Sequence, residues 1–145
     1  MAQKDDFDLQ LFLPYLLAQA AEAASAGFQR LYKQRYGMLR TEWRVLFHLG
    51  IYGEMTARDI GARAGLHKTK ISRAVAALET KRLLTRSRKT EDRRQESLSL
   101  TPAGRAVYRD LREIAEGYDA RLVAGLSAEE AATLRRLLQS LAGQS

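Results

Sequence analysis

The chain has 145 residues, of which 46% are hydrophobic, and a formal net charge of +7. This length and apolar content suit one domain or two small closely packed lobes, and they exclude a disordered chain. The absence of cysteine excludes disulfides, thiol redox chemistry and zinc–cysteine sites. No apolar run reaches the roughly 18 residues of a membrane span, and the first residues lack a signal-peptide pattern, so we predict a cytoplasmic protein without a membrane partner.

The N-terminal part predicts a helix over residues 14–36, because proline is tolerated in the first turn of a helix. Apolar residues then recur at spacings of three and four and form one stripe: Leu17, Ala20, Ala21, Ala24, Phe28, Leu31 and Tyr32. Upstream of this helix, four large side chains have no obvious place in a monomer: Phe7, Leu9, Leu11 and Phe12. They favour packing against a second copy of the chain.

A second helix is predicted over residues 42–49. Gly37 can end the preceding helix in a left-handed conformation, and Thr41 can cap the new one. Gly50 is expected to close it. The helix is apolar on most sides, which indicates a central position in the fold. Met55 is expected to form a very short strand.

The middle of the chain predicts two short helices joined by a turn. Thr56 and Asp59 form a weak capping-box match at the start of the first helix, and Gly65 makes the turn. The second helix, residues 68–81, is expected to bury Ile71, Val75 and Leu78. Its N-terminal end and open face are therefore polar and basic. This is a helix-turn-helix pattern, whose second helix suits the major groove of DNA.

Residues 83–88 and 95–100 alternate with a period of two, which predicts a β-hairpin with a charged tip. Thr101 then caps a long helix predicted over residues 102–126. A last helix follows, which begins with a capping box and carries a leucine stripe: Ser127, Glu130, Leu134, Leu137, Leu138 and Leu141.

The positive charge is concentrated in residues 56–104, which hold twelve Lys and Arg against five Asp and Glu. The rest of the chain is neutral, so the whole net charge lies in this stretch. Such confinement favours a defined face that binds a polyanion over a diffuse basic tail. A basic membrane-binding helix would share the charge, but it would not need the turn residues described above.

This order of elements resembles the MarR family of bacterial winged-helix regulators over almost the entire chain. The most specific part is similar to the family's wing-and-exit signature: Asp92-Arg93-Arg94 followed by Leu98, Leu100-Thr101 and Gly104. Two further segments resemble the recognition helix and the second helix of the family: Ser72-Arg73-x-Val75-x-x-Leu78 and Thr41-x-Trp43-x-Val45-Leu46.

Two positions depart from the family pattern. Arg82 stands where the family usually has glycine, so a left-handed backbone there is held by a residue that tolerates it less well. His67 stands where Asp or Ser often caps the recognition helix, which places that cap in question.

The resemblance implies a mainly α fold with a small β-wing. Residues 37–101 are expected to form a winged helix-turn-helix lobe, and residues 1–36 and 102–145 a helical dimerisation lobe. An obligate homodimer would then bind a pseudo-palindromic operator in double-stranded DNA. The terminal segments support a dimer independently, because they are nearly neutral and more apolar than a monomer needs.

Long cationic donors pair with guanine acceptors and phosphates, and the hydroxyls of Thr and Ser pair with several partners on DNA. On this basis ten residues are predicted to form the DNA-binding site: Lys68, Thr69, Lys70, Ser72, Arg73, Arg86, Arg88, Asp92, Arg93 and Arg94. Arg94 is expected to enter the minor groove, with Asp92 orienting its guanidinium, while Arg93 and Arg88 contact phosphate. The simpler alternatives are a solvated helix face and a hairpin that only aids solubility.

The resemblance also implies a small, often aromatic or anionic, effector between the two lobes. Arg40, beside Trp43 and Tyr36, can receive a carboxylate there. The predicted pocket comprises Phe28, Tyr32, Tyr36, Arg40, Trp43, Phe47 and His48. A purely structural core is the simpler explanation for the aromatic residues, as a hydrogen-bonded core role is for His48.

No catalytic constellation or glycine-rich phosphate loop is visible, and two histidines without cysteine make a poor metal site. We therefore predict neither an enzyme nor a cofactor or metal. The leading hypothesis is a homodimeric repressor that a small effector releases from DNA. The alternatives are a nonspecific architectural DNA-binding protein and a winged helix that binds only proteins.

Overall fold

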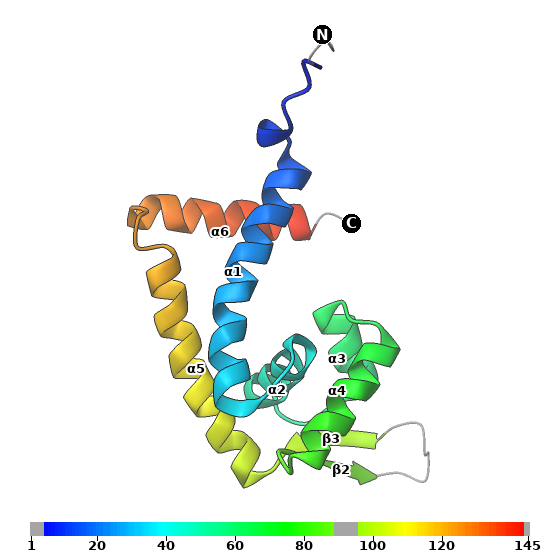
Figure 1. The fold of residues 1–145 in the computed structure, drawn as a ribbon. Helices are drawn as coiled ribbons and strands as arrows, with labels where there is room; N and C mark the ends of the chain where they lie inside the picture. Colours follow the sequence, from blue (N-terminus) through cyan, green and yellow to red (C-terminus); the bar gives the residue numbers. More distant parts are fainter. Residues whose placement is uncertain (1–4, 89–95, 144–145) are drawn as a thin grey trace. The chain divides into compact units, whose positions relative to one another are not determined.

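The computed structural model describes residues 5–88 and 96–143 and confirms a mainly helical fold with a small antiparallel sheet (Figure 1). The elements are η1 (Leu9–Leu11), α1 (Leu13–Tyr36), α2 (Arg40–Tyr52), β1 (Met55–Thr56), α3 (Ala57–Ala64), α4 (Lys68–Thr80), β2 (Leu84–Arg88), β3 (Glu96–Leu100), α5 (Pro102–Leu122) and α6 (Ala128–Ala142). The chain divides into two compact units, residues 1–111 and 112–145. The predicted division into a winged lobe and a dimerisation lobe stays a prediction.

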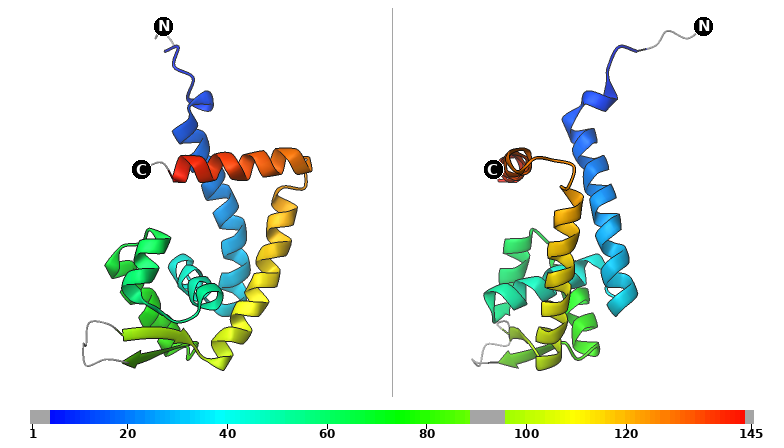
Figure 2. Two further views of the ribbon diagram at one scale, coloured as in Figure 1. Left: turned by 180° about the vertical axis from the view of Figure 1, so that it is seen from behind. Right: turned by 90° about the vertical axis from the view of Figure 1, so that its left-hand side faces the viewer.

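Helix α1 begins one residue before the predicted start and ends where predicted. Gly37 adopts φ 63° and donates its N–H to the Lys33 carbonyl, as expected for a left-handed helix end. Tyr32, near this end, is buried, whereas the N-terminal half of α1 extends away from α2–α4 (Figure 2). Large apolar side chains are therefore exposed at that end: Phe7, Leu9, Leu11, Phe12, Leu13 and Leu16.

Helix α2 is longer than predicted at both ends. Thr41 lies inside it and is not the cap; instead the Glu42 carboxylate accepts the Leu39 N–H at 3.1 Å. Gly50 does not close the helix either, since Gly53 does. The reason is tertiary: a Cβ at Gly50 would lie 2.5 Å from the Tyr108 ring, so glycine lets that ring pack on the helix.

The helix-turn-helix prediction is confirmed by α3 and α4. The Thr56 hydroxyl accepts the Asp59 N–H at 3.1 Å, and Gly65 makes the turn at φ 66°. Gly61 allows the close crossing of the two helices, because a Cβ there would lie 2.8 Å from Ile71. One face of α4 is buried: Ile71, Ala74, Val75 and Leu78.

The predicted hairpin and short strand form a three-stranded antiparallel sheet in the order β1-β3-β2. Leu84 pairs with Leu100 and Met55 with Leu98, and the three leucines are buried. The sheet lies beside α3 and α4 (Figure 1). The hairpin tip, residues 89–95, lies outside the described residues.

The joint between α4 and the wing has the backbone that the sequence predicted. Arg82 adopts φ 62°, and its N–H donates to the Glu79 carbonyl at 2.9 Å. The Leu83 N–H donates to the Leu78 carbonyl, also at 2.9 Å. These two bonds are those of a Schellman helix end, in which glycine is the usual left-handed residue.

Helix α5 was expected to reach residue 126 but ends at Leu122. Residues 123–126 instead form a turn, in which Ala124 and Leu126 donate to carbonyls three residues earlier. The capping box of α6 is confirmed, because Ser127 and Glu130 exchange two hydrogen bonds of 2.9 and 3.1 Å. Among the described residues no helix is long and apolar enough to cross a membrane.

Candidate nucleic-acid interface and effector site

The N-terminal end and open side of α4 carry five exposed residues that were predicted to contact DNA: Lys68, Thr69, Lys70, Ser72 and Arg73. Within residues 5–88 and 96–143, none of these side chains makes a hydrogen bond or an ion pair. His67 precedes the helix without a capping side-chain bond, so the first amides of α4 also stay open. The N-terminal end of the helix adds a partial positive charge to these cations.

The two arginines of β2 are different, because acidic side chains pair with both. Arg86 lies 3.2 Å from Glu79 of α4 and 3.3 Å from Glu96 of β3, and Arg88 lies 3.2 Å from Glu96. The hydrogen bonds from Arg86 and then Arg88 lower the pKa of the Glu96 carboxyl. The sequence interpretation missed both glutamates, although a closed hairpin places Glu96 opposite Arg88.

Ser72 of α4 and Arg86 of β2 line one small hollow of about 140 Å³. Arg58, from the first turn of α3, lines it too, and the sequence interpretation did not include this residue. Its signal in the sequence was a basic side chain at the start of the first helix of the helix-turn-helix. Asp92, Arg93 and Arg94 lie outside the described residues, so their roles stay predictions.

Four of the seven residues predicted for an effector pocket come together as an aromatic cluster. The ring centroids of Phe28 and Trp43 lie 5.2 Å apart, those of Trp43 and Phe47 5.3 Å, and those of Phe28 and Tyr32 5.1 Å. The rings meet edge to face, the geometry that aromatic pairs favour. Tyr108 of α5 extends the cluster at 5.2 Å from Phe47, and the sequence interpretation had missed it.

Arg40 is exposed at the start of α2, within electrostatic reach of Tyr32. Burial raises the pKa of the Tyr32 hydroxyl, while a hydrogen bond with Trp43 and the charge of Arg40 act in the opposite direction. The charge of Arg40 therefore acts on Tyr32 of the aromatic cluster, and Arg40 makes no ion pair among the described side chains.

Tyr36 and His48 have other contacts. The Tyr36 hydroxyl donates to Asp110, which also pairs with Arg35 at 2.6 Å. Burial, followed by the bond to Asp110, raises the pKa of Tyr36. His48 Nδ1 lies 2.6 Å from the Arg44 carbonyl, which can only accept a hydrogen bond. Tyr36 is therefore bonded to α5, and His48 is bonded to the backbone of its own helix.

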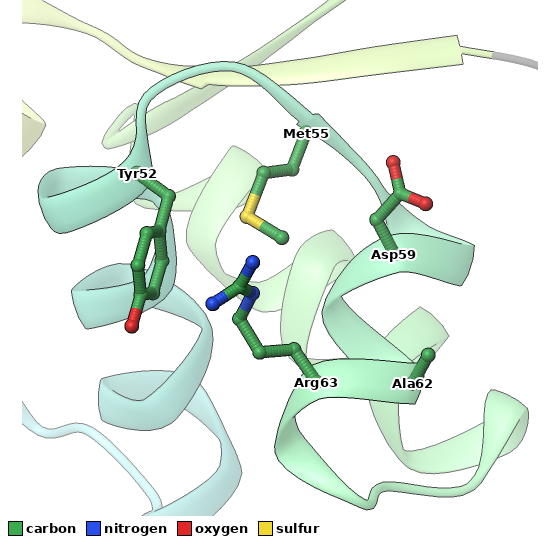
Figure 3. A pocket seen from close by; sticks show the side chains of 5 residues that line it. All are labelled: Tyr52, Met55, Asp59, Ala62 and Arg63. Atoms are coloured by element: carbon green, nitrogen blue, oxygen red, sulfur yellow. The ribbon is translucent and has the colours of Figure 1, made fainter.

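An open depression of about 580 Å³ lies between the end of α2 and α3 (Figure 3). Arg63 extends into it between Tyr52 and Met55, with its guanidinium 4.1 Å from the centre of the Tyr52 ring. Arg44 donates to the Ala64 carbonyl at 2.7 Å. Both arginines hold α3 against α2, so the contacts around this depression have a structural role.

Comparison with known proteins gives a consistent set of relatives. A family model described as "MarR family" matches residues 36–95. The homoprotocatechuate degradative operon repressor of Escherichia coli is 30% identical over 128 residues, which cover 88% of this chain and 85% of that protein. An uncharacterized HTH-type transcriptional regulator of Bacillus subtilis, YwaE, is 27% identical over 107 residues, and this match covers 74% of the chain but 63% of YwaE.

The fold is also found in solved structures. The crystal structure of NadR in complex with 4-hydroxyphenylacetate has a TM-score of 0.75 at 25% identity, and the match covers 100% of both chains. The two curated relatives are named as an HTH-type transcriptional regulator and an operon repressor. In the parts of the chain that the structure describes, no three His, Asp or Glu side chains are grouped as metal ligands.

Proposed function

The chain belongs to the MarR family of transcriptional regulators, and we propose that it acts in the cytoplasm as a homodimeric repressor of a pseudo-palindromic operator. One observation carries the proposal: the three cations on the open face of α4 have no acidic partner among the described residues. Lys68 and Lys70 stand in the first turn of the helix, where its dipole is positive, and Arg73 stands in the next turn.

The contrast with the wing strengthens this proposal. Arg86 and Arg88 are held by glutamates, so their net contribution to the local field is small. The α4 cations stay available for phosphate oxygens and guanine acceptors, the two partners that long cationic side chains find on DNA. DNA binding is therefore expected to depend chiefly on α4 and on the hairpin tip.

A dimer follows from the exposed apolar ends of the chain. Phe7, Leu11 and Leu13 are 60–74% exposed near the start of α1, and the leucines of α6 are 42–47% exposed. Monomeric proteins rarely expose so many large apolar side chains together, and such surfaces mark sites of interaction with another surface. Two copies of α4 in a dimer would read half-sites about 34 Å apart. Sedimentation that shows a folded monomer at micromolar concentration would contradict this part of the proposal.

The DNA proposal is tested by selection and competition. Fragments of genomic DNA that bind the protein are enriched, and the best one is labelled. Unlabelled copies of it and a scrambled sequence of the same length then compete at the same salt concentration, because salt weakens specific and nonspecific binding alike. A repressor requires much weaker competition by the scrambled DNA. Equal competition would favour a nonspecific architectural protein.

We further propose an aromatic carboxylate as the effector. The aromatic cluster offers ring faces and edges, and Arg40 offers a cation beside them. Two similar proteins point to the same chemistry, because one represses a homoprotocatechuate operon and another was crystallised with 4-hydroxyphenylacetate. An effector can release DNA only if it binds the non-operator arrangement of the dimer more tightly.

The effector proposal has a direct optical test, because Trp43 is the single tryptophan of the chain and lies in the cluster. Titration with 4-hydroxyphenylacetate is expected to change its fluorescence with a saturable profile. The Arg40→Gln variant keeps the cluster and should bind the carboxylate at least tenfold more weakly. Phenol, which lacks the carboxylate, should change the fluorescence of both proteins equally. If both proteins also gave the same titration with 4-hydroxyphenylacetate, Arg40 would not be the residue that binds the carboxylate.

A further inference from the structure

We propose that Glu42 and Lys81 form a positioning pair that sets the direction of α4, the recognition helix, against the corner between α1 and α2. Neither residue touches the face of α4 that is assigned to DNA. Their effect on operator binding rests on the function proposed above, whereas their effect on the direction of α4 does not. The contacts that support the pair come from the Lys81 ammonium and from the backbone that follows Lys81.

The Lys81 ammonium joins three elements. Lys81 follows the last residue of α4, and its ammonium donates to the Glu42 carboxylate of α2 at 2.7 Å. It also donates to the carbonyl of Gly37, the left-handed residue that ends α1, at 3.1 Å. A single side chain at the end of α4 is thus bonded to the last turn of one helix and the first turn of another.

The Glu42 carboxylate also has two hydrogen-bond partners. Its second carboxylate oxygen accepts the Leu39 N–H at 3.1 Å, so both oxygens have partners. Glu42 is 3% exposed and is the one buried charged residue in the described part of the chain. Ion pairs of this kind add little net stability, because apolar residues of the same shape would often serve as well. Their better-attested use is to select one arrangement, and this supports a positioning role.

The backbone next to Lys81 ties the same end of α4 to the wing and to α5. The Thr101 hydroxyl donates to the Arg82 carbonyl at 2.8 Å, and the Thr101 N–H donates to the Leu83 carbonyl at 3.0 Å. A Cβ at Gly104 would lie 2.0 Å from that carbonyl oxygen, so the start of α5 is pressed against it. The C-terminal end of α4 is therefore fixed on two sides.

Because α4 is long, a small tilt at its C-terminal end displaces its N-terminal end by a large distance. Thirteen residues separate Lys68 from Lys81, which at about 1.5 Å per residue is roughly 20 Å. A tilt of about 5° at Lys81 would then move Lys68 by roughly 2 Å. Hydrogen bonds to bases tolerate only a few tenths of an ångström, so the tilt would break them. Glu42 also precedes Trp43, which links the pair to the aromatic cluster.

Two variants separate positioning from stability. Lys81→Met leaves the buried Glu42 carboxylate without its cation and is expected to be less stable. Glu42→Gln combined with Lys81→Met removes both charges, while the glutamine can still accept the Leu39 N–H, so its unfolding midpoint should be close to that of the parent protein. Lys33→Met, on the exposed side of α1, is the matched control for the loss of one lysine.

The direction of α4 can be measured without DNA. The chain has no cysteine, so Gln34→Cys and Ser72→Cys provide two labelling sites for spin labels on α1 and α4. The labelled protein is diluted with unlabelled protein, so that only distances within one chain are recorded. We expect a narrow distance distribution in the parent, and a broader or shifted one when Glu42→Gln and Lys81→Met are added.

The two measurements have distinct outcomes. The proposal predicts an altered distance distribution and, in the unlabelled double variant, operator affinity at least tenfold lower than in the Lys33→Met control. An unchanged distance distribution, or unchanged affinity for an operator that the parent binds specifically, would overturn it. If the parent shows no specific DNA binding, the proposed repressor function fails, and the spin-label distances alone decide whether the pair sets the direction of α4.

Discussion

Replacing Arg82 by glycine should stabilise the protein. Arg82 holds φ 62° at the end of α4, where a side chain crowds the backbone. A left-handed backbone costs an L-residue about 1–2 kcal/mol, whereas glycine adopts it freely. Glycine loses more backbone freedom on folding, and this entropy cost offsets the gain in stability by about 0.5–1 kcal/mol. Since the two Schellman bonds at 2.9 Å need only the backbone, Arg82→Gly should gain about 0.5–1 kcal/mol of unfolding free energy.

The assay is urea unfolding at one fixed protein concentration, because the stability of a dimer depends on concentration. Arg82→Ala is the matched control, since it removes the same charge and the same long side chain but keeps the Cβ atom. Its stability should lie within about 0.5 kcal/mol of the parent, clearly below Arg82→Gly. If alanine stabilises as much as glycine, the gain comes from charge or side-chain entropy, and the backbone explanation is wrong.

Three further changes follow from particular contacts. Gly104→Ala should cost about 1–3 kcal/mol in urea unfolding, because its Cβ would lie 2.0 Å from the Leu83 carbonyl oxygen; a neutral result would mean that α5 can shift freely. Arg86 and Arg88 lower the folded-state pKa of Glu96, so their bonds to the Glu96 carboxylate stabilise the fold at a pH above the usual carboxyl pKa. This contribution is lost as the pH falls through the folded-state pKa. Glu96→Gln should therefore flatten the decline of the unfolding midpoint between about pH 5 and 3, and an unaltered pH profile would argue against the pairing. Arg94→Ala should weaken operator binding by about 1–3 kcal/mol while sedimentation still shows a dimer, and unchanged affinity would remove Arg94 from the minor groove.

Local sequence signals were enough for most of the fold. The left-handed glycines at 37 and 65, the Thr56 cap and the Ser127–Glu130 box each act within a few residues, and each is found where predicted. The left-handed Arg82 was also predictable, because the resemblance to the MarR family indicated a glycine-like backbone at that position.

The errors arose where distant residues decide. Gly50 looked like a helix end, but its role is to admit the ring of Tyr108, which lies far along the chain. The pairing of Glu42 with Lys81 and of Arg86 with Glu79 depends on how helices and strands meet, which no local pattern records. Of the predicted effector residues, four aromatic ones share a helix-spacing signal and do cluster, whereas Tyr36 and His48 have partners that the pattern did not reveal.

The central claim is that the unpaired cations of α4 hold the operator. The most direct test compares two triple variants that lower the net charge equally. One carries Lys68→Ala, Lys70→Ala and Arg73→Ala; the other carries Arg30→Ala, Arg105→Ala and Arg109→Ala, at exposed positions on α1 and α5. Fluorescence anisotropy at one salt concentration should show a loss of roughly a hundredfold or more for the first variant and little loss for the second. Equal losses in both variants, or none in the first, would contradict the claim.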